Sequence, residues 1–442
     1  MNAKSMTKLQ QPISAEQAES FLRALFEQAL RAVRPELCLP PIVSEFQRSL
    51  YTPPRRTIVI GAGKAAAAMA ATLEQEWQAG PLEGLVITRY GHLDPTFRPR
   101  QIRVIEASHP VPDAVGQQAA QECLQLVQGL SSDDLVICLW SGGGSALMSL
   151  PAPGVSLEEK QALNRALLRC GATIHEINAV RKHLSAIKGG RLALACSPAR
   201  VHSFVISDVA GDDLSVIASG PTVPDASTSQ DALAILLRYH VPYSASLQAY
   251  LESAASETPK QFPPELRSQV DVIASAQTAL DAAGVWASTY GVDIHILSDR
   301  LQGEARELGR EHAALALEMV RSPLDRPQLI LSGGETTVQV KGTGRGGRNT
   351  EYLLSCAIHL QGHPQIFALA ADTDGIDGSE DNAGAWIGPQ TLALAQQLRL
   401  HAGDFLERND AYGFFQSVNT LLLTGPTMTN VNDFRALLIL PK

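Results

Sequence analysis

The chain repeatedly places a glycine-rich turn, carrying charged or hydroxyl side chains, directly after a short apolar run. The first turn reads Gly61-Ala-Gly63-Lys64 and follows the apolar residues 57–60. Glycine lets the backbone turn tightly and approach an anion, and the helix expected next presents free N–H groups at its N-terminus. Lys64 adds a positive charge there. The turn predicts contact with a phosphate; a structural turn with a solvated lysine is the alternative.

A second turn, Ser141-Gly142-Gly143-Gly144-Ser145, follows the apolar residues 135–140. Three consecutive glycines between serines suit a nest of backbone N–H groups around a phosphate. Glycine is unfavourable in regular structure, so a triple run beside a buried strand indicates close backbone approach. A flexible structural loop is the alternative.

Two nucleotide-binding motifs fit the first turn poorly. Its G-x-G-x-x-A pattern overlaps the dinucleotide fingerprint, which also needs a carboxylate at the end of the next strand to hold the ribose. That strand is expected to end at Thr88-Arg89, so NAD is disfavoured, although Arg89 leaves NADP open. A Walker A loop is excluded because the leading glycine and the Ser or Thr after the lysine are missing.

Basic side chains gather in residues 178–191 of a chain whose net charge is −9. They are Arg181, Lys182, Lys188 and Arg191. A guanidinium fork suits a carboxylate or phosphate, and a lysine acts as a point charge. We expect Arg181 and Lys182 to bind the substrate; a solvated helix face is the alternative.

Carboxylates cluster after two expected strands. Asp208, Asp212 and Asp213 follow residues 201–207, and Asp372, Asp374 and Asp377 follow residues 366–370. Mg²⁺ is held through one or two such oxygens plus substrate phosphates, whereas aspartate also favours turns and helix caps. The second cluster is not an EF-hand, because the required downstream glutamate is absent.

Residues 332–351 hold two further candidate segments. Gly333-Gly334-Glu335 follows an expected strand, and Arg348-Asn349 opens an expected helix. We expect the first segment to contact a cofactor. A helix N-terminus would reinforce the attraction of Arg348 for a phosphate or carboxylate, and Asn349 is expected at the substrate. A disordered arginine–glycine segment is the alternative, which the amphipathic helix that follows disfavours.

The hydrophobic pattern predicts the elements that must position these turns. Expected strands are residues 57–60, 84–88, 102–106, 135–140, 201–207, 270–274, 292–298, 328–332, 366–370 and 420–424. Expected helices include residues 65–78, 115–129, 157–170, 304–320, 349–360 and 389–397. This alternation predicts an α/β fold of two three-layer α/β/α domains with mainly parallel sheets, the first Rossmann-like. Ligands of such sheets bind beyond the carboxyl ends of the strands.

A polar, proline-containing stretch at residues 243–269 marks the expected domain boundary. We predict an N-terminal domain over residues 14–255 and a C-terminal domain over residues 265–442. A first helix begins after Ser14, where Gln17 completes a capping box, and prolines at 35, 40 and 41 punctuate it. This helix is expected in the N-terminal domain or packed on the other one.

Composition excludes several classes of function. The 442 residues are 45% hydrophobic and 18% charged, which is typical of globular proteins. The acidic balance disfavours nucleic acid, and six cysteines without a C-x-x-C pair disfavour a zinc site. The polar residues 1–11 lack a secretory h-region, and no apolar stretch approaches the ~20 residues that span a bilayer. We expect a cytoplasmic protein with no membrane partner; a homodimer is compatible with the sequence.

Together these motifs resemble those of the glycerate 2-kinase family, whose C-terminal region is called MOFRL. The matched motifs are GAGKA, HPxPD, SGGGSAL, VRKHLSxIKGGRLA, SDVxGDDLSVIASGPTVPD, SGGETTV, GxGGRNxE, DTDGxDG and TGPTxTNV, at residues 61–65, 109–113, 141–147, 180–193, 207–225, 332–338, 344–351, 372–378 and 424–431. The resemblance covers essentially the whole chain after the first helix.

The resemblance implies ATP-dependent transfer to the C2 hydroxyl of D-glycerate, with Mg²⁺, in a cleft between two α/β domains. It also implies that Lys64 and Arg348 are catalytic or substrate-contacting cations. Our own assignment adds Asp208 as a catalytic group and Asp212, Asp372 and Asp374 at the metal, with Asp208 and Asp212 interchangeable.

Two other functions stay open. One is an NAD(P)H-dependent hydroxypyruvate reductase, a label that relatives of this family have carried. The other is a non-catalytic sensor of a sugar or nucleotide, which would leave both acidic clusters unexplained.

Overall fold

A computed structural model describes residues 13–94 and 98–442 of the chain, which divides into two compact units. One unit is the continuous segment Pro35–Ile273, and the other combines residues 13–34 with Ala274–Lys442. The second boundary lies later than the expected start of a domain at residue 265. The N-terminal segment 1–11, considered above for a secretory signal, lies outside the described residues.

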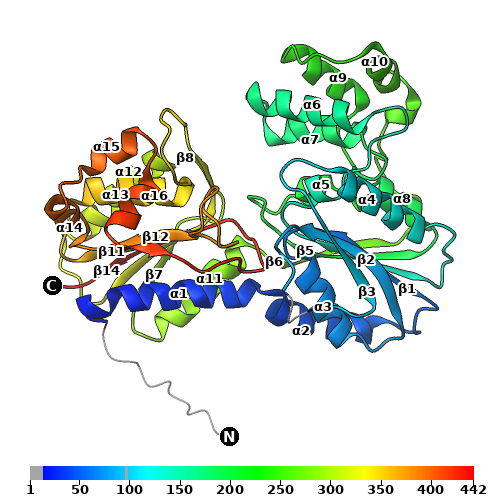
Figure 1. Ribbon diagram of the computed structural model, residues 1–442. Helices are drawn as coiled ribbons and strands as arrows, with labels where there is room; N and C mark the ends of the chain where they lie inside the picture. The colour runs from blue at the N-terminus through cyan, green and yellow to red at the C-terminus, as the bar shows by residue number, and fades with distance from the viewer. Residues whose placement is uncertain (1–12, 95–97) are drawn as a thin grey trace, which may run out of the picture. The chain divides into compact units, whose positions relative to one another are not determined.

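The sheet of the Pro35–Ile273 unit runs in the order β3-β2-β1-β4-β5-β6 (Figure 1). Its strands are β1 (Thr57–Ala62), β2 (Leu82–Arg89), β3 (Ile102–Ala107), β4 (Leu135–Trp140), β5 (Arg200–Ile206) and β6 (Ser268–Ala274). The pairs β3–β2, β2–β1, β1–β4 and β4–β5 are parallel. This is the strand order of the Rossmann fold, so the expectation for the first sheet is confirmed. The strand expected at residues 270–274 is β6, which belongs to this sheet.

Helices cover both faces of this sheet. Figure 1 shows α2 (Pro35–Ser49) and α3 (Ala66–Glu76) on one face, and α4 (Ala114–Leu126), α5 (Gly144–Leu147) and α8 (Arg191–Cys196) on the other. Every residue of β1 and β4 is buried. Strands covered on both faces read as continuous apolar runs, which is why the sequence revealed them.

α2 was not expected, because three prolines had been taken to end the helical pattern. Pro35 occupies the first helical position, where its missing N–H costs nothing. Pro40 and Pro41 lie inside the helix and cannot donate to the preceding turn. The buried side chains of Leu39, Val43 and Phe46 on its inner face offset that loss.

A separate group of helices forms a second core within the same unit. It comprises α6 (Leu157–Arg169), α7 (Ile174–His183), α9 (Ser229–Arg238) and α10 (Ala245–Leu251), which lie together in Figure 1. Each begins at a serine or threonine whose side chain accepts a backbone N–H of the first turn: Ser156, Thr173, Thr228 and Ser244. Their apolar faces meet in a core distinct from that of the sheet.

The sheet of the other unit runs in the order β13-β12-β11-β14-β9-β7. Its strands are β7 (Asp293–Ile296), β9 (Gln328–Ser332), β11 (Ile366–Asp372), β12 (Gly384–Ile387), β13 (Leu421–Leu422) and β14 (Asp433–Ile439). Only β7–β9 is parallel among the pairs of this sheet in the described chain. The expectation of a second mainly parallel sheet was therefore wrong. The connection of residues 373–383 between β11 and β12 is too short for a crossover helix, so these strands pair antiparallel.

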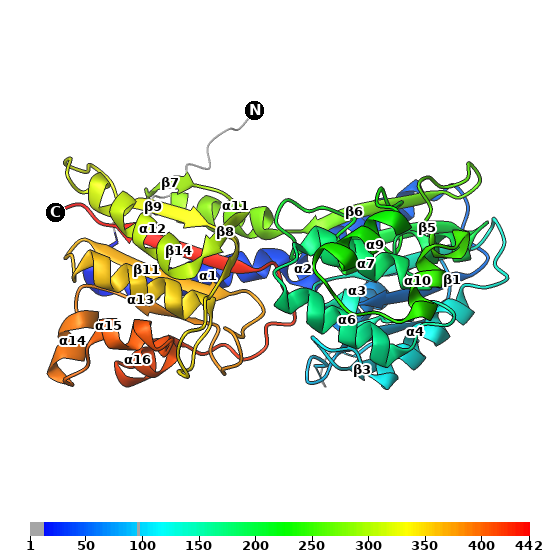
Figure 2. The same ribbon diagram turned by 90° about the horizontal axis from the view of Figure 1, so that it is seen from above.

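Helices cover this second sheet on both faces as well. Figures 1 and 2 show α12 (Ala305–Met319) and α13 (Arg348–Leu360) side by side on one face, with α14 (Thr391–Gln397), α15 (Ala402–Glu407) and α16 (Ala411–Ser417) near them. The other face carries α1 (Ala18–Val33) and α11 (Ala276–Ser288). Phe21 of α1 stacks on Trp286 at 5.2 Å between ring centroids, and Phe26 lies 5.6 Å from Phe434. A short ribbon of β8 (Leu301–Glu304) and β10 (Gly334–Thr337) completes the unit.

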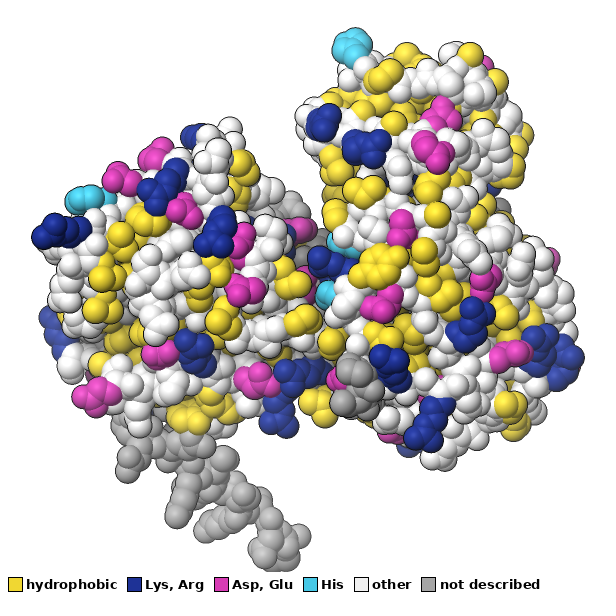
Figure 3. Space-filling model, viewed as in Figure 1, with side chains coloured by type: hydrophobic (Ala, Val, Ile, Leu, Met, Phe, Trp, Pro, Cys, Tyr) yellow, Lys and Arg dark blue, Asp and Glu magenta, His cyan; other side chains and the backbone are white. Residues whose placement is uncertain are grey.

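Charged side chains of both signs are interspersed on one face of the molecule (Figure 3). On the face drawn in Figure 3, Lys and Arg side chains alternate with Asp and Glu and form no continuous basic stripe. None of the described helices combines the length and apolar character needed to cross a membrane.

Candidate functional site

The glycine turns that follow β1 and β4 meet at the carboxyl edge of the first sheet. The amide of Lys64 donates to the Gly142 carbonyl at 2.8 Å, and the amide of Ala65 donates to Ser141 Oγ at 3.0 Å. In this strand order, the chain turns to opposite sides after β1 and β4. Ligands of open α/β sheets bind at that switch point.

The glycines themselves have a structural reason to be there. A Cβ on Gly61 would lie 2.2 Å from the Leu139 carbonyl oxygen, and one on Gly63 would lie 2.0 Å from Ser141 Oγ. Gly143 has φ +83° and packs against the ring of His109. The backbone approach predicted for these glycines therefore occurs between the two turns, and it brings Lys64 beside the Ser141–Ser145 turn.

A chain of hydrogen bonds runs from the second turn into the helical group. Ser145 Oγ lies 2.7 Å from Ser219 Oγ, and Ser219 Oγ donates to Asn178 Oδ1 at 3.0 Å. Arg181 Nη1 donates to the same Asn178 oxygen at 3.4 Å. Lys188 Nζ returns to the turn, donating to the Ser145 carbonyl at 2.9 Å. The network positions two cations, Arg181 and Lys188, beside the predicted phosphate turn.

A third cation joins them that sequence analysis missed. Lys160 of α6 is buried, and its Nζ has no hydrogen-bond partner in the described chain. Burial, with the charge of Arg181, lowers the pKa of Lys160 to about 7. Burial also lowers the pKa of Lys188, and the charges of Lys160 and Arg181 lower it further. The sequence does contain a signal for the burial of Lys160. Leu163 and Leu167 follow it at i+3 and i+7, so the three side chains share one helix face, and that face is buried.

Lys182, which we expected to bind the substrate, forms an ion pair within the protein. Its Nζ donates to Asp225 Oδ1 at 3.1 Å, and both side chains are buried. Burial opposes ionisation of Asp225, but Lys182 outweighs it and lowers the pKa of that carboxyl. The carboxylate that Lys182 binds in this structure thus belongs to the protein. The solvated helix face considered as the alternative is also absent here, because Lys182 and His183 are buried.

The acidic side chains after β5 lie partly exposed beyond the strand. Asp208 follows the strand closely, and Asp212 sits at φ +56° in the turn after Gly211. Aspartate tolerates this left-handed backbone better than most residues. The turn hypothesis for Asp212 thus has support beside the metal hypothesis.

The second unit gathers its candidate residues around Arg348, at the first turn of α13. Arg348 Nε donates to Asp433 Oδ1 at 2.7 Å, Nη1 to Glu335 Oε1 at 2.8 Å, and Nη2 to Asp372 Oδ2 at 3.0 Å. Burial opposes the charge of Arg348, but Asp433, Asp372 and Glu335 outweigh it and raise its pKa. Glu335 is the exposed partner, with 51% of its side chain accessible.

Asp433 links this arginine to a second, fully buried one. Arg435 donates through Nη2 to Asp433 and through Nη1 to the Gly333 carbonyl at 3.0 Å. Asn349 Nδ2 also donates to Asp433, at 2.8 Å. Burial favours the neutral form of Asp433, but Arg348 and Arg435 outweigh it and lower its pKa. Sequence analysis did not single out Asp433, because its partners lie on distant segments.

The N-terminus of α13 is occupied by a protein carboxylate. Asp377 accepts the amides of Asn349 and Thr350, each at 2.9 Å, and the Thr350 hydroxyl at 2.7 Å. Burial raises the pKa of Asp377. A Cβ on Gly347 would lie 2.3 Å from Asp377 Oδ1, which explains that glycine. The helix end expected to bind an anion is therefore capped by the chain itself.

The two aspartates expected at a metal shape the turn after β11. The amide of Asp374 donates to Asp372 Oδ1 at 3.0 Å, and the amide of Ile376 donates to Asp374 Oδ1 at 2.8 Å. Asp212 belongs to the other unit. Within residues 13–94 and 98–442, no group of three or more His, Cys, Asp or Glu side chains is arranged to hold a metal ion.

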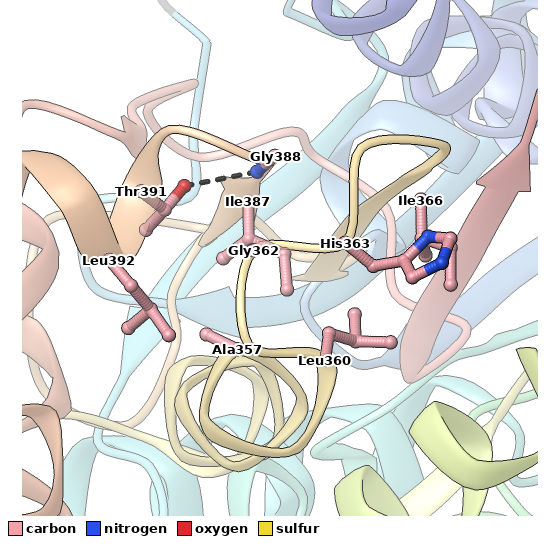
Figure 4. A pocket seen from close by; sticks show the side chains of 9 residues that line it. All are labelled: Ala357, Leu360, Gly362, His363, Ile366, Ile387, Gly388, Thr391 and Leu392. Carbon is pink, nitrogen blue, oxygen red and sulfur yellow. Dashed lines mark hydrogen bonds between the residues drawn. The ribbon is translucent and has the colours of Figure 1, made fainter. Parts of the chain in front are cut away.

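Gly333 joins β9 to β10, which begins at Gly334. Gly334 has φ +107°, and a Cβ there would lie 2.2 Å from the Leu301 oxygen of β8. Ser332 Oγ beside them is buried without a hydrogen-bond partner in the described residues. Away from this cluster, a void of about 10 Å³ lies between α13 and α14, lined by Leu360, Ile366, Ile387 and others (Figure 4). Its lining is mostly apolar but includes His363 and Thr391, and it has room for one water at most, so it is too small for a substrate.

Comparison with known proteins matches both halves of the chain to protein families. Residues 21–252 match the family described as domain of unknown function DUF4147, and residues 328–433 match the MOFRL family. The chain is 42% identical over 380 residues to the D-glycerate 2-kinase of Thermotoga maritima, covering 86% of this chain and 89% of that protein. The chain belongs to the glycerate kinase family. The predicted resemblance is thereby confirmed.

Solved structures and further relatives agree with membership of the glycerate kinase family. The crystal structure of glycerate kinase from Thermotoga maritima superposes with a TM-score of 0.86 at 39% identity, covering 96% of this chain and all of that one. A protein of Agrobacterium vitis is 46% identical over 426 residues, covering 96% of this chain and 94% of its own, and carries the provisional name hydroxypyruvate reductase. Family members have thus received both names.

Proposed function

We propose that this protein is a glycerate 2-kinase that transfers the γ-phosphoryl group of ATP to the C2 hydroxyl of D-glycerate. Its match to a D-glycerate 2-kinase over 86% of the chain carries the proposal. The cation-lined turn at the switch point of the first sheet supports it independently. Phosphoryl transfer needs neutralised phosphate oxygens and fixed orientation more than covalent chemistry, and such a turn supplies both.

We assign roles to the residues as follows. Lys64 and the Ser141–Ser145 turn bind phosphate, Lys64 neutralises charge that develops during transfer, and Asp208 accepts the proton of the substrate hydroxyl. Arg348 is the second catalytic cation, reached from solvent where its exposed partner Glu335 lies. Asn349 Oδ1, buried without a partner in the described chain, suits a hydroxyl donor of the substrate.

Mg²⁺ suits the oxygen donors of Asp372 and Asp374, which follow one another in the turn after β11. Proteins commonly hold this ion through only one or two carboxylates, with nucleotide phosphates and water completing the shell. When bound, it would neutralise phosphate oxygens. We propose Asp372 and Asp374 as its ligands. Asp212, which lies in the other unit, stays a prediction from the sequence.

The name hydroxypyruvate reductase requires a nicotinamide site, and the turn after β1 suits one poorly. The second glycine of a dinucleotide fingerprint leaves room for the pyrophosphate. Here Ser141 fills the space beside Gly63, and its hydroxyl oxygen accepts a hydrogen bond from the amide of Ala65, just before α3. β2 ends at Arg89 without a ribose-binding carboxylate. We therefore favour the kinase.

The test is an enolase-coupled assay of the purified protein with D-glycerate, ATP and Mg²⁺. Without a mutase, enolase accepts only 2-phosphoglycerate, so a signal reports both the transfer and the carbon that is phosphorylated. ADP release without an enolase signal would contradict transfer to C2. NADPH oxidation with hydroxypyruvate, and no kinase signal, would instead establish the reductase.

A further inference from the structure

Lys160, Arg181 and Lys188 form a cluster of positive charge inside the Pro35–Ile273 unit, hereafter the cation cluster. Lys160 comes from α6, Arg181 from α7, and Lys188 from the segment before α8. Hydrogen bonds place them together: Arg181 donates to Asn164, which lies one helical turn after Lys160 on α6, and Lys188 is linked to Arg181 through Ser145, Ser219 and Asn178. The charge of Arg181 also lowers the pKa of Lys160, and the charges of Lys160 and Arg181 lower the pKa of Lys188. None of the three forms an ion pair with a carboxylate in the described portion of the chain.

Such a cluster is unfavourable for the fold alone. Burying a charge costs free energy unless it is paired, and like charges repel more strongly in a low dielectric. The neutral partners are few: Arg181 donates to Asn164 Oδ1 at 2.5 and 2.8 Å, and Lys188 donates to the carbonyls of Ser145 and Ala218. Lys160 is only 7% exposed, and its buried Nζ has no such partner among the described residues. An arrangement of this kind persists where a ligand supplies the negative charge.

The charge and position of the cluster indicate the chemistry of that ligand. Three cations exceed what one carboxylate neutralises, whereas a polyphosphate carries several negative charges in a row. Lys188 and Ser145 join the cluster to the glycine turn after β4, at the switch point of the sheet. The neighbouring hydroxyls of Ser145 and Ser219 are further donors for phosphate oxygens.

We infer that the cation cluster binds the polyphosphate group of the nucleotide, with Lys160 as its unpaired anchor. This inference rests on the proposed function and refines it. On this inference Arg181 binds the phosphate donor. The sequence had instead predicted that Arg181 binds the acceptor substrate. Because these residues bind the nucleotide, their loss should weaken the affinity for ATP more than the affinity for glycerate.

The test compares full-length wild type with Lys160→Met and Arg181→Met, each of which keeps an unbranched apolar stem. Arg165→Met, on the exposed side of the same helix α6, is the matched control. We measure KM for ATP at saturating glycerate, KM for glycerate at saturating ATP, and the Kd of inorganic tripolyphosphate by calorimetry. Thermal unfolding of each variant is recorded alongside.

We expect each cluster variant to raise the KM for ATP and the Kd of tripolyphosphate by about 10-fold or more, the size of a lost charge-assisted hydrogen bond. The KM for glycerate should stay within about 3-fold, and Arg165→Met should match wild type. Lys160→Met should unfold at the same or a higher temperature than wild type, because it removes an unpaired buried charge. Weaker binding together with unchanged or greater stability is not what a purely structural residue would give.

Two results would overturn the inference: a rise in the KM for glycerate alone, which would mark a carboxylate site, or unchanged constants throughout. If Lys160→Met does not fold, Arg181→Met decides by the same constants. The proposed function fails separately. A wild type that binds tripolyphosphate through the cluster but does not phosphorylate glycerate would keep the phosphate site and refute the kinase.

Discussion

Arg348 and Asp433 are joined by a hydrogen bond of 2.7 Å between Nε and Oδ1, although 85 residues separate them in the sequence. Asp433 is fully buried and also binds Arg435. A buried carboxylate between two arginines is held in one orientation, and it holds the guanidinium of Arg348 in turn. With Nε held by Asp433, the two Nη atoms of Arg348 are directed at Glu335 and Asp372.

Replacing Arg348 by methionine should lower kcat/KM for glycerate phosphorylation by about 100-fold or more, as loss of a preorganised cation does. The fold should lose less than the ~3–5 kcal/mol of an orphaned buried charge, because Asp433 keeps Arg435 and Asn349. Steady-state kinetics and urea unfolding measure the two effects. Arg345→Met removes an exposed arginine of the same loop and serves as control. Equal kinetics in both variants would reject a catalytic role for Arg348.

Lys64→Met should reduce kcat/KM by about 100-fold or more while leaving the fold intact. The contacts that join the two glycine turns use the backbone amides of Lys64 and Ala65, which the substitution retains. The measurement is the enolase-coupled rate, with circular dichroism as the check on folding. Rates close to wild type would remove Lys64 from the site.

Gly63→Ala should destabilise the protein more than Gly80→Ala. Both glycines have positive φ, +147° and +120°, but only the Cβ at position 63 meets other atoms, at 2.0 Å from Ser141 Oγ. We expect a difference in unfolding free energy of about 2 kcal/mol or more, from the overpacking. Denaturant titration of the two variants gives this difference directly. Equal losses of unfolding free energy in the two variants would mean that the positive φ alone, and not the close contact with Ser141, requires glycine at position 63.

Lys182→Met should destabilise the fold by about 3–5 kcal/mol, because it leaves Asp225 buried without its cation. The double variant Lys182→Met/Asp225→Asn should recover part of that loss. The KM for glycerate should not change in whatever fraction remains folded. A raised KM with normal stability would restore Lys182 to the substrate site.

Stability should depend on pH through His312, which hydrogen-bonds Tyr352 at 2.7 Å. Burial, with the charge of Arg435, lowers the pKa of His312 to about 4. Between about pH 4 and pH 6.5 the unfolded chain therefore binds a proton here that the folded chain does not, so stability falls as pH falls through this window. From pH 7 to pH 4, wild type should lose roughly 3 kcal/mol relative to His312→Gln. Parallel pH profiles of the two proteins would contradict this assignment.

The sequence predicted the first sheet well, because buried parallel strands such as β4 are continuous apolar runs with glycine turns behind them. It predicted the second sheet poorly. β12 and β14 were not among the expected strands, and the direction of β11 against β14 depends on pairing between segments far apart. The glycine turns and Arg348 could be found from local spacing. The burial of Lys160 could have been predicted from the helix face that it shares with Leu163 and Leu167. Its place beside Arg181 and Lys188 could not, because these residues come from other segments of the chain.

The membership of α1 in the unit completed by Ala274–Lys442 has a consequence for synthesis of the protein. Trp286, the stacking partner of Phe21, is translated 265 residues after it (286 − 21), and Phe434 follows Phe26 by 408 residues (434 − 26). At about 5–20 residues per second, the apolar face of α1 waits from roughly ten seconds to over a minute for its partners. The whole Pro35–Ile273 unit emerges and can fold in that interval. Until β14 has been translated, the apolar face of α1 therefore lacks side chains that cover it in the folded protein.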